Sequence, residues 1–338
     1  MNYRRVITVA VSFAITAVFL ALALHSVDLT KLASAFASAD YRLVAIGAVF
    51  TCASYVLRTV RWQRFLAPSK LIPVARLFPV LIVGFALNNL LPGRPGEFAR
   101  AYAVGQREML SKTLGFATIV VERVMDGFTL IAFLLLALAA FIPLHLNLPD
   151  FAERIAVAAT LIFGIALAGM FFLLLREEVA LALARIVTSR LPHGVAARVE
   201  GMLSSFVVGL HSLRSAGGLA FIVLLSVAIW ACEASSYLFV LTAFGALPNF
   251  ASRLVAAAFM MVLINLGVMI PAAPGGVGPF EAAGIFALGV FGLREIGASV
   301  ALSAHAVQYL LITALGLLFI WREGISLAQT TSTPEAEE

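Results

Sequence analysis

A dense group of polar residues interrupts an otherwise apolar sequence and combines amides, arginines and carboxylates at short spacing. Its members are Asn88, Asn89, Arg94, Glu97, Arg100, Glu122, Arg123 and Asp126. The guanidinium fork of an arginine matches the geometry of phosphate oxygens. On a helix, Glu122 and Asp126 share a face because they are four residues apart, and Arg123 is within reach of Asp126. This pattern favours a polar groove for a phosphate-bearing group. The alternative is an internal charge network that holds helices together.

The composition indicates whether the protein surrounding these residues is soluble or lies in a membrane. The chain has 338 residues, of which 62% are hydrophobic and only 12% charged, and its mean hydropathy is +1.03. Soluble domains are about half apolar and a quarter charged. The sequence therefore predicts an all-α polytopic membrane protein and excludes a pair of soluble domains. A nucleic-acid-binding role is not expected, because the net charge is only +5 and the cations are spread over many loops.

Long uncharged runs predict the membrane-spanning elements, since an apolar helix needs about 20 residues to cross the hydrocarbon core. Six full crossings are expected, at residues 6–24, 41–60, 127–142, 155–175, 219–243 and 296–321. An amphipathic stretch within 176–214 predicts an interfacial helix. These elements form one integral-membrane domain over residues 1–325, and the acidic segment 326–338 is expected to be a disordered tail.

Two further hydrophobic stretches, 77–93 and 254–290, contain or adjoin helix breakers. These breakers are Pro92, Pro95 and Gly96 in the first, and Pro271, Pro274, Gly275, Gly276 and Gly278 in the second. Proline removes a backbone donor and glycine weakens a helix, so both stretches are expected to be broken or re-entrant helical hairpins. Backbone groups freed at membrane depth persist only where protein buries them or where they face a water-filled cavity. Each break therefore predicts a polar interior.

The two breaks share the pattern P-x-x-P-G, 179 residues apart, and similar elements surround each. We therefore expect an internal repeat with halves at about residues 1–150 and 151–325. Lysines and arginines in short loops favour the cytoplasm, and 18 of the 23 fall on one side if the N-terminus is inside. This predicts that both termini are cytoplasmic and that the hairpins enter from opposite sides. The halves are then inverted, as in many transporters.

The second half also carries polar residues within its hydrophobic stretches. They are Glu233, Asn265, Glu281, His305 and Gln308. Ionisable groups in hydrocarbon are costly and persist where they pair or line a pathway. We expect Glu281, which follows the second break, to face the same cavity as Glu97. We expect His305 to be a hydrogen-bonding residue rather than a ligand. For Glu233, a proton carrier and a helix-packing contact are equal alternatives.

The motifs of several enzyme classes are absent from the sequence. It contains no G-x-x-x-x-G-K-[ST] phosphate loop, no H-E-x-x-H and no G-x-S-x-G. ATP hydrolysis is therefore not expected. The five histidines and two cysteines form no metal-ligating pattern, so neither a metal nor a cofactor is expected. Cys52 and Cys232 fall in apolar runs and are expected to be inert thiols.

Three segments together resemble the lysylphosphatidylglycerol synthase transmembrane, or flippase-like, family. They are Asn89-Leu-Leu-Pro-Gly-Arg-Pro-Gly-Glu-Phe-Ala-Arg-Ala-Tyr102, Glu122-Arg-Val-Met-Asp126 and Pro274-Gly-Gly-Val-Gly-Pro-Phe-Glu281. The chain is similar, over residues 1–325, to the membrane domain of the bacterial multiple peptide resistance factor. The resemblance implies a helical membrane domain that moves aminoacylated phospholipid between leaflets. It does not imply the lipid-modifying step, which in the synthase belongs to an additional soluble domain.

The leading hypothesis is a translocase that moves a phospholipid or lipid-linked headgroup between the leaflets of a bacterial inner membrane. A polar groove between the two broken hairpins would replace the water of the headgroup while the acyl chains stay in lipid. One alternative is an intramembrane lipid-modifying enzyme with Glu97, Glu122, Asp126 or Glu281 as a base. Another is a non-catalytic scaffold for a lipid-synthesising partner. Membrane lipids are the expected partners in each case.

Overall fold

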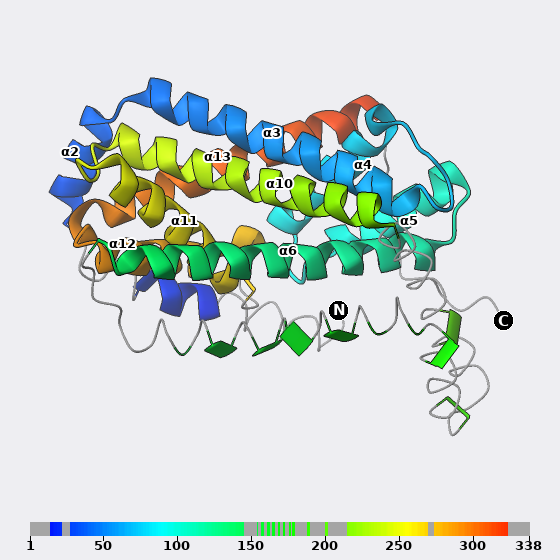
Figure 1. Cartoon of the computed structure of the whole chain (residues 1–338). Coiled ribbons are helices and arrows are strands. Elements are labelled where there is room, and N and C mark those ends of the chain that lie inside the picture. The colour runs from blue at the N-terminus through cyan, green and yellow to red at the C-terminus, as the bar shows by residue number, and fades with distance from the viewer. Residues whose placement is uncertain are drawn as a thin grey trace.

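The computed structural model describes residues 14–21, 28–144, 215–269 and 274–323, together with scattered positions between 154 and 201. Throughout this part of the chain every regular element is helical (Figure 1). The elements are α2 (Leu29–Ser38), α3 (Tyr41–Leu66), α4 (Val74–Leu90), α5 (Gly96–Glu108), α6 (Lys112–Phe141), α10 (Ala216–Ala243), α11 (Phe250–Gly267), η2 (Pro274–Gly276), α12 (Pro279–Val290) and α13 (Arg294–Glu323). The predicted all-α class agrees with this architecture.

Five of the described helices, α3, α6, α10, α11 and α13, are long and apolar enough to cross a membrane. Three of them contain the crossings expected at 41–60, 219–243 and 296–321, and α6 covers the crossing expected at 127–142 except for its last residue. The other expectations fall wholly or mostly outside the described residues. These are the crossings at 6–24 and 155–175, the interfacial helix within 176–214 and the tail at 326–338.

Two helices depart from the boundaries that uncharged runs predict. Helix α6 begins at Lys112 and runs through Glu122 and Asp126, because arginines pair with these carboxylates inside the molecule. Helix α11 is by itself long enough to span a membrane. The first arm of the second broken segment is therefore a full-length helix rather than half of a short hairpin.

Polar side chains mark the starts of several helices. Asp28, Asp40, Ser111, Ser215 and Asn249 each accept a hydrogen bond from a backbone N–H in the helical turn that follows. Such caps satisfy donors that the first turn of a helix leaves without a partner. They fix where α2, α3, α6, α10 and α11 begin.

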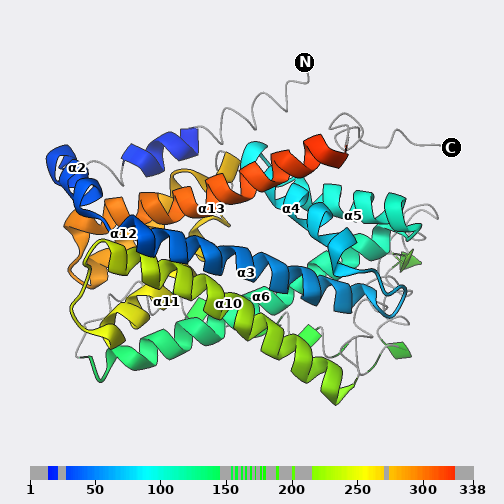
Figure 2. The same ribbon diagram turned by 90° about the horizontal axis from the view of Figure 1, so that it is seen from above.

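The helices pack in a reciprocal arrangement. Helices α3 and α10 run side by side (Figures 1 and 2). Helix α13 packs on α4, and α6 packs on α11, so each long helix that follows a break contacts the helix that precedes the other break. The short helices α5 and α12 each contact the helix before and the helix after them. This arrangement brings the two breaks together.

Buried apolar side chains join these helices into a core. One cluster includes Phe141 of α6 and Phe259 of α11, and another includes Trp62 of α3 and Ile312 of α13. Large apolar side chains also cover outward faces, such as Leu136 of α6, which is 68% exposed. Extensive exposed apolar surface is expected where hydrocarbon, rather than water, surrounds the protein.

At the first break, the chain turns sharply between α4 and α5. Gly93 and Arg94 have φ values of 81° and 53°, in a left-handed region that glycine tolerates and arginine rarely adopts. Helix α5 then folds back on α4 so closely that a Cβ at Gly96 would overlap the backbone oxygen of Gly84. A larger residue at position 96 would therefore push the two helices apart.

At the second break, the short 3₁₀ helix η2 separates α11 from α12. Gly275, Gly276 and Gly278 have φ values of 73°, 74° and 96°. Residues 270–273, which include Pro271, lie outside the described part of the chain. The described glycines adopt backbone conformations that residues with a Cβ rarely occupy.

Candidate functional site

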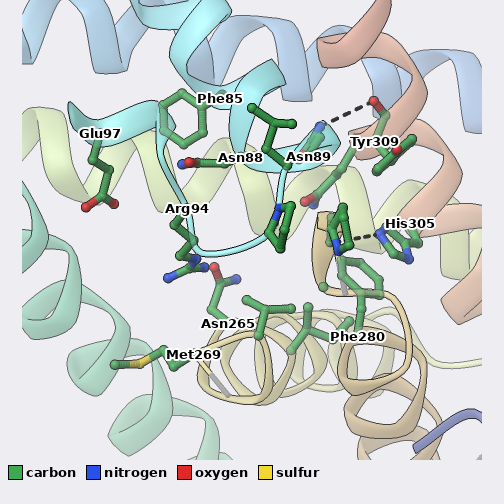
Figure 3. A pocket seen from close by; sticks show the side chains of 18 of the residues that line it. Phe85, Asn88, Asn89, Arg94, Glu97, Asn265, Met269, Phe280, His305 and Tyr309 are labelled. Atoms are coloured by element: carbon green, nitrogen blue, oxygen red, sulfur yellow. Dashed lines mark hydrogen bonds between the residues drawn. The ribbon is translucent and has the colours of Figure 1, made fainter. Parts of the chain in front are cut away.

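A cavity of about 320 Å³ lies between the two breaks. Its wall comes from both halves of the chain, since α3, α4, α6 and the first break meet α11, α12, α13 and the second break there. Apolar side chains such as Phe85, Met269 and Phe280 form part of the wall. Its polar side chains include Asn88, Asn89, Arg94, Glu97, Arg123, Asn265, His305, Gln308 and Tyr309 (Figure 3). The cavity is therefore amphipathic.

The second break packs against the end of α4, next to the first break, at this cavity. A Cβ at Gly275 would overlap the ring of Tyr309 and would come within 3.4 Å of the backbone oxygen of Asn89. Asn89 also donates from Nδ2 to Oγ1 of Thr313 at 3.1 Å, which ties the end of α4 to α13. The two P-x-x-P-G segments, far apart in the sequence, thus contribute neighbouring parts of one wall.

Amide side chains come to the cavity from both halves. Asn88 of α4 accepts a hydrogen bond at Oδ1 from the backbone N–H of Gly96 at 2.8 Å, which fixes the first turn of α5. Asn265 of α11 donates from Nδ2 to the backbone oxygen of Met261 at 2.9 Å. Both residues line the cavity, so it offers neutral polar groups beside its charges.

Arg94 has the least compensated charge in this cavity. Its side chain is exposed and lines the cavity (Figure 3). Among the described residues, ion pairs join Arg100 and Arg123 to carboxylates, whereas none joins a carboxylate to Arg94. The Arg94 guanidinium is therefore available to an anionic group that enters the cavity.

Arg123 provides a second cation, which is partly engaged. Its Nη2 contacts Oε1 of Glu122 at 2.5 Å and Oδ2 of Asp126 at 3.5 Å, and its Nε lies 3.9 Å from Oε1 of Glu97. The side chain of Arg123 is 37% exposed, so part of the guanidinium remains open to the cavity. Glu97 is the only carboxylate among the described lining residues.

Arg100 and Glu122 lie behind the cavity rather than in its wall. Arg100 donates from Nη1 and Nη2 to the two carboxylate oxygens of Glu122, at 3.2 and 3.0 Å. The two side chains are 2% and 0% exposed, and the guanidinium stacks 4.3 Å from the ring centroid of Trp62. For this pair the structure favours a charge network that holds helices together over a headgroup contact.

Asp126 belongs to the same buried network. Arg61 donates from Nη2 to Oδ1 of Asp126 at 2.7 Å, and Trp230 donates from Nε1 to the same oxygen at 3.1 Å. Arg58 lies 3.6 Å from Oδ2 of Asp126 and 3.4 Å from Oε1 of Glu233. The network therefore ties α3 to α6 and α10, and Glu233 acts in it as a helix-packing contact.

The sequence indicates that Arg58 and Arg61 are buried, because they lie on one face of α3, although a count of charges alone treats them as loop residues. Arg58 and Arg61 continue the helix face that carries Ser54, whose hydroxyl donates to Oε1 of Glu233 at 2.7 Å. A polar stripe at helical spacing inside an apolar run indicates a buried polar face. Arg58, Arg61 and Arg100 are buried, so they do not belong to the loop charges from which the orientation was predicted.

On the other side of the cavity, His305 lines the wall and Glu281 lies behind it. Oε1 of Glu281 is 2.5 Å from Nδ1 of His305, and Nε2 of His305 is 3.1 Å from the backbone oxygen of Gly275. The ring of Phe280 stacks on the imidazole with 4.1 Å between centroids. Glu281 is not among the residues that line the cavity with Glu97, which differs from the expectation for this residue.

The part of the chain that the structure describes holds no group of three or more His, Cys, Asp or Glu side chains close enough to bind a metal ion. Cys52 on α3 and Cys232 on α10 are free, half-buried thiols. The described wall of the cavity offers guanidinium, amide, imidazole, phenol and carboxylate groups.

Comparison with known protein families identifies the family that shares these motifs. The family described as the lysylphosphatidylglycerol synthase transmembrane region matches residues 9–316. The chain belongs to this family. Both breaks, the cavity and the buried charge network lie within the matched residues, so the resemblance predicted from three motifs is confirmed. As a member with several long apolar helices, the chain is a multi-pass membrane protein.

Curated relatives include archaeal membrane proteins. A UPF0104 membrane protein of Methanothermobacter thermautotrophicus is 27% identical, over 88% of this chain and 90% of the relative. A second UPF0104 membrane protein of that organism is 26% identical, over 83% of each chain. The glycosyltransferase AglD of Haloferax volcanii is 28% identical over 99% of this chain, which spans only 57% of that relative. No solved structure matches the chain.

Proposed function

We propose that the protein moves a lipid between leaflets by passing its headgroup through the cavity between the two breaks. One observation carries this proposal: two helix breaks, far apart in the sequence, line a single amphipathic cavity, and no described carboxylate forms an ion pair with the Arg94 guanidinium in it. A charged headgroup loses its water in hydrocarbon without gaining new partners, which is costly. The cavity supplies such partners while the acyl chains remain in the bilayer.

A phosphate is the part of a headgroup that the cavity suits best. Arg94 has no ion-pair partner among the described residues, and Arg123 is partly exposed. Guanidinium groups bind phosphate oxygens through two parallel N–H donors. On this proposal, the groups that contact the headgroup are Asn89, Arg94, Glu97 and Arg123. Those that keep the helices in position are Arg100, Glu122, Asp126 and Glu281.

The proposed transport cycle uses the two halves as an inverted repeat. Its support is the reciprocal packing of α13 on α4 and of α6 on α11, together with Asn89 and Asn265 near the ends of α4 and α11. Two similar halves can exchange conformations at a small energy difference, which exposes a fixed site to each side in turn. Each half alone supplies only one side of the cavity.

The proposed orientation places both termini in the cytoplasm of the cell that makes the protein. Lys70 lies in the loop between α3 and α4, and Arg76 lies in the first turn of α4, at the same end of the molecule. Cations in such loops favour the cytoplasmic side of the membrane. Helix α2 adjoins the opposite end of α3 and would face outward. The first broken hairpin would then enter the membrane from the cytoplasm and the second from the outside.

One comparison favours a second candidate function. The Haloferax volcanii relative is named a glycosyltransferase, and nearly all of this chain matches part of it. The candidate is therefore a membrane domain that takes part in a lipid-modifying reaction, either as the enzyme or as a scaffold for a lipid-synthesising partner. Glu97 is the carboxylate in the described wall that would serve as a base. This function would change the lipid covalently, whereas translocation would not.

The experiment that separates these candidates uses the full chain purified into liposomes. Three fluorescently labelled lipids are tested: phosphatidylglycerol, its lysyl ester and a polyprenyl-phosphate-linked sugar. An impermeant quencher abolishes the fluorescence of label in the outer leaflet only. Translocation predicts that the protein exposes inner-leaflet label of at least one lipid without changing the lipid mass. A changed mass would select the enzyme. Neither movement nor change for any lipid would refute translocation by this chain.

A further inference from the structure

Glu281 and His305 form a closed set of hydrogen bonds at the second break. Oε2 of Glu281 accepts from the backbone N–H of Gly278 at 2.7 Å, while Oε1 faces Nδ1 of His305 at 2.5 Å. Nε2 of His305 faces the backbone oxygen of Gly275 at 3.1 Å. Phe280 stacks on the imidazole and holds the ring in this orientation. The Glu281 and His305 side chains are 3% and 9% exposed.

These contacts fix the number of protons that the pair holds. A carbonyl oxygen only accepts hydrogen bonds, so Nε2 of His305 carries a hydrogen. Nδ1 and the facing carboxylate oxygen are also at hydrogen-bond distance, and this contact requires a hydrogen between them because both atoms otherwise present lone pairs. The hydrogen belongs either to the imidazolium or to the carboxylic acid. In both cases the pair holds one proton more than a neutral histidine beside an ionised glutamate.

Loss of that proton removes one of the bonds at the break. A neutral His305 has a single N–H, which can be donated to Gly275 or to Glu281 but not to both. Both acceptors belong to the second break, because Gly275 lies in η2 and Glu281 lies in the first turn of α12. Release of the proton therefore loosens the cavity wall at this break, and binding of the proton closes it.

The first break has a corresponding contact, in which an arginine takes the place of the histidine. Arg100 joins α5 to α6 through its two hydrogen bonds to Glu122, as Glu281 joins α12 to α13 through His305. A guanidinium stays protonated at any physiological pH, whereas imidazole is the side chain that changes charge between about pH 5 and 8. Of these two contacts, only the second contains an imidazole, whose two ring nitrogens can each carry or lack a hydrogen.

The surroundings of the pair leave the cavity as the route for this proton. Tyr309 lies edge-on to His305 on α13, with 5.8 Å between ring centroids. Residues 14–21, which approach Gly278, contain no ionisable side chain. In the described part of the chain, no ion pair joins the Glu281–His305 pair to another charge. The other titratable or charged groups around the cavity are Tyr55 and Arg58 on α3, Arg94 in the first break, Glu97 on α5, Arg123 on α6 and Glu233 on α10.

We infer that Glu281 and His305 form a proton-binding site that couples lipid movement to a proton gradient. The inference rests on the proposed translocation and adds its driving ion. The transferred species is the single H⁺ held between Nδ1 and Oε1, which passes to water in the cavity and is later replaced from water. No covalent bond between heavy atoms changes, and no electron is transferred. One proton is bound when the second break is closed and released when it opens.

The variant Glu281→Gln separates the proton from the contacts that it supports. A glutamine at this position keeps each contact, because its oxygen accepts from Gly278, its amide donates to Nδ1 of a neutral His305, and Nε2–H still donates to Gly275. The variant is therefore expected to fold without the exchangeable proton. Glu295→Gln is the matched control, since it makes the same chemical change on α13 at an exposed side chain outside the cavity.

The first measurement places the full-length proteins in liposomes with the membrane potential clamped and a pH gradient imposed. For one proton per lipid, a gradient of about one pH unit supports up to a tenfold ratio of lipid between leaflets. We expect the parent and Glu295→Gln to approach this ratio. We expect Glu281→Gln to lose the accumulation. Gradient-driven accumulation by Glu281→Gln, or movement by the parent that ignores the gradient, would overturn the proton site.

A second measurement needs no lipid movement and so distinguishes this inference from the proposed function. With Cys52 and Cys232 replaced by alanine, a cysteine is introduced at Met269 in the cavity wall or at Met109, which is 89% exposed and lies outside it. The ratio of their labelling rates cancels the pH dependence of the thiol itself. We expect the ratio to change with pH in the parent and to stay constant with Glu281→Gln. If this ratio depends on pH in the same way in the parent and in Glu281→Gln, the proton site is overturned even if lipid moves. If the ratio behaves as expected but no lipid moves, only the proposed translocation is refuted.

Discussion

Arg100 and Glu122 form a two-point ion pair, with N–O distances of 3.2 and 3.0 Å, that joins α5 to α6 behind the cavity. Because both side chains are almost fully enclosed, removal of one partner leaves the other as an unpaired buried charge. The pair therefore fixes the position of the helix that follows the first break. We therefore expect its role to be structural, although both residues belong to the polar group that the sequence singled out.

Arg100→Ala is accordingly expected to destabilise the protein by about 3–5 kcal/mol. Thermal unfolding of the detergent-solubilised protein measures the effect. Arg42→Ala, at the exposed start of α3, serves as the control and should change stability by less than about 0.5 kcal/mol. Equal melting temperatures for the two variants would contradict a supporting role for the buried pair.

Arg94→Gln is expected to slow lipid movement while leaving stability unchanged. The Arg94 side chain is exposed to the cavity and forms no ion pair with any described carboxylate, so the folded protein loses little without it. A hydrogen bond to a charged group contributes about 1.5–3 kcal/mol, which corresponds to a tenfold or greater loss of rate. Proteoliposome transport and thermal unfolding of one preparation check both statements, with Arg42→Gln as the control. Parental transport by Arg94→Gln would show that the headgroup does not use this guanidinium.

Acid should weaken a contact at the end of α5. Lys70 and Arg76 lie 2.8 and 3.3 Å from the carboxylate oxygens of Glu108, and the hydrogen bond from Lys70 is the main cause that lowers the pKa of Glu108. Because the folded pKa is below the unfolded one, the contact stabilises the protein above the unfolded value of about 4.3 and is lost as pH falls through the folded value.

The variant Glu108→Gln tests this pH dependence. Lys70 and Arg76 are 44% and 64% exposed, so the contribution should stay below about 1 kcal/mol. Melting temperatures of the parent and the variant should differ near neutral pH and converge as the pH falls through the folded pKa of Glu108. A difference that persists unchanged into acid would mean that the charge of Glu108 does not contribute.

Cysteine accessibility tests the proposed orientation. Ser34 of α2 and Ser69, which follows α3, lie beyond opposite ends of α3 and are both exposed. After replacement of Cys52 and Cys232, an impermeant thiol reagent added to intact cells should label Ser34→Cys but not Ser69→Cys. Permeabilised cells should label both. The opposite pattern in intact cells would invert the topology.

Much of the fold follows from simple rules applied to the sequence. Uncharged runs identify α3, α10 and α13, and proline and glycine predict the interruptions beside α5 and α12. Those rules act over short distances. They do not reveal that Arg61 of α3 pairs with Asp126 of α6, because this contact depends on how two helices pack. The 18 cations assigned to the cytoplasmic side included Arg61, which is in fact buried within α3.

The site shows the same limit. Composition and spacing identified Arg94, Arg100 and Arg123 as one cationic group, yet these residues have different roles. Arg100 forms a buried ion pair with Glu122. Arg123 also pairs with Glu122 but remains partly exposed to the cavity, and Arg94 lines the cavity without an ion pair to any described carboxylate. Which charge is paired depends on the fold of the break and on the face that α6 presents, and neither is encoded in local spacing.

Blocking the cavity tests most directly the claim that the headgroup passes between the breaks. Met269→Cys, in a background without Cys52 and Cys232, is modified to completion with a bulky thiol reagent in proteoliposomes that already move lipid. Met109→Cys receives the same treatment as the matched control, because Met109 is exposed and lies outside the cavity wall. We predict that modification at 269 abolishes lipid movement and that modification at 109 does not. Lipid movement that continues at the unmodified rate with position 269 fully modified would contradict the account.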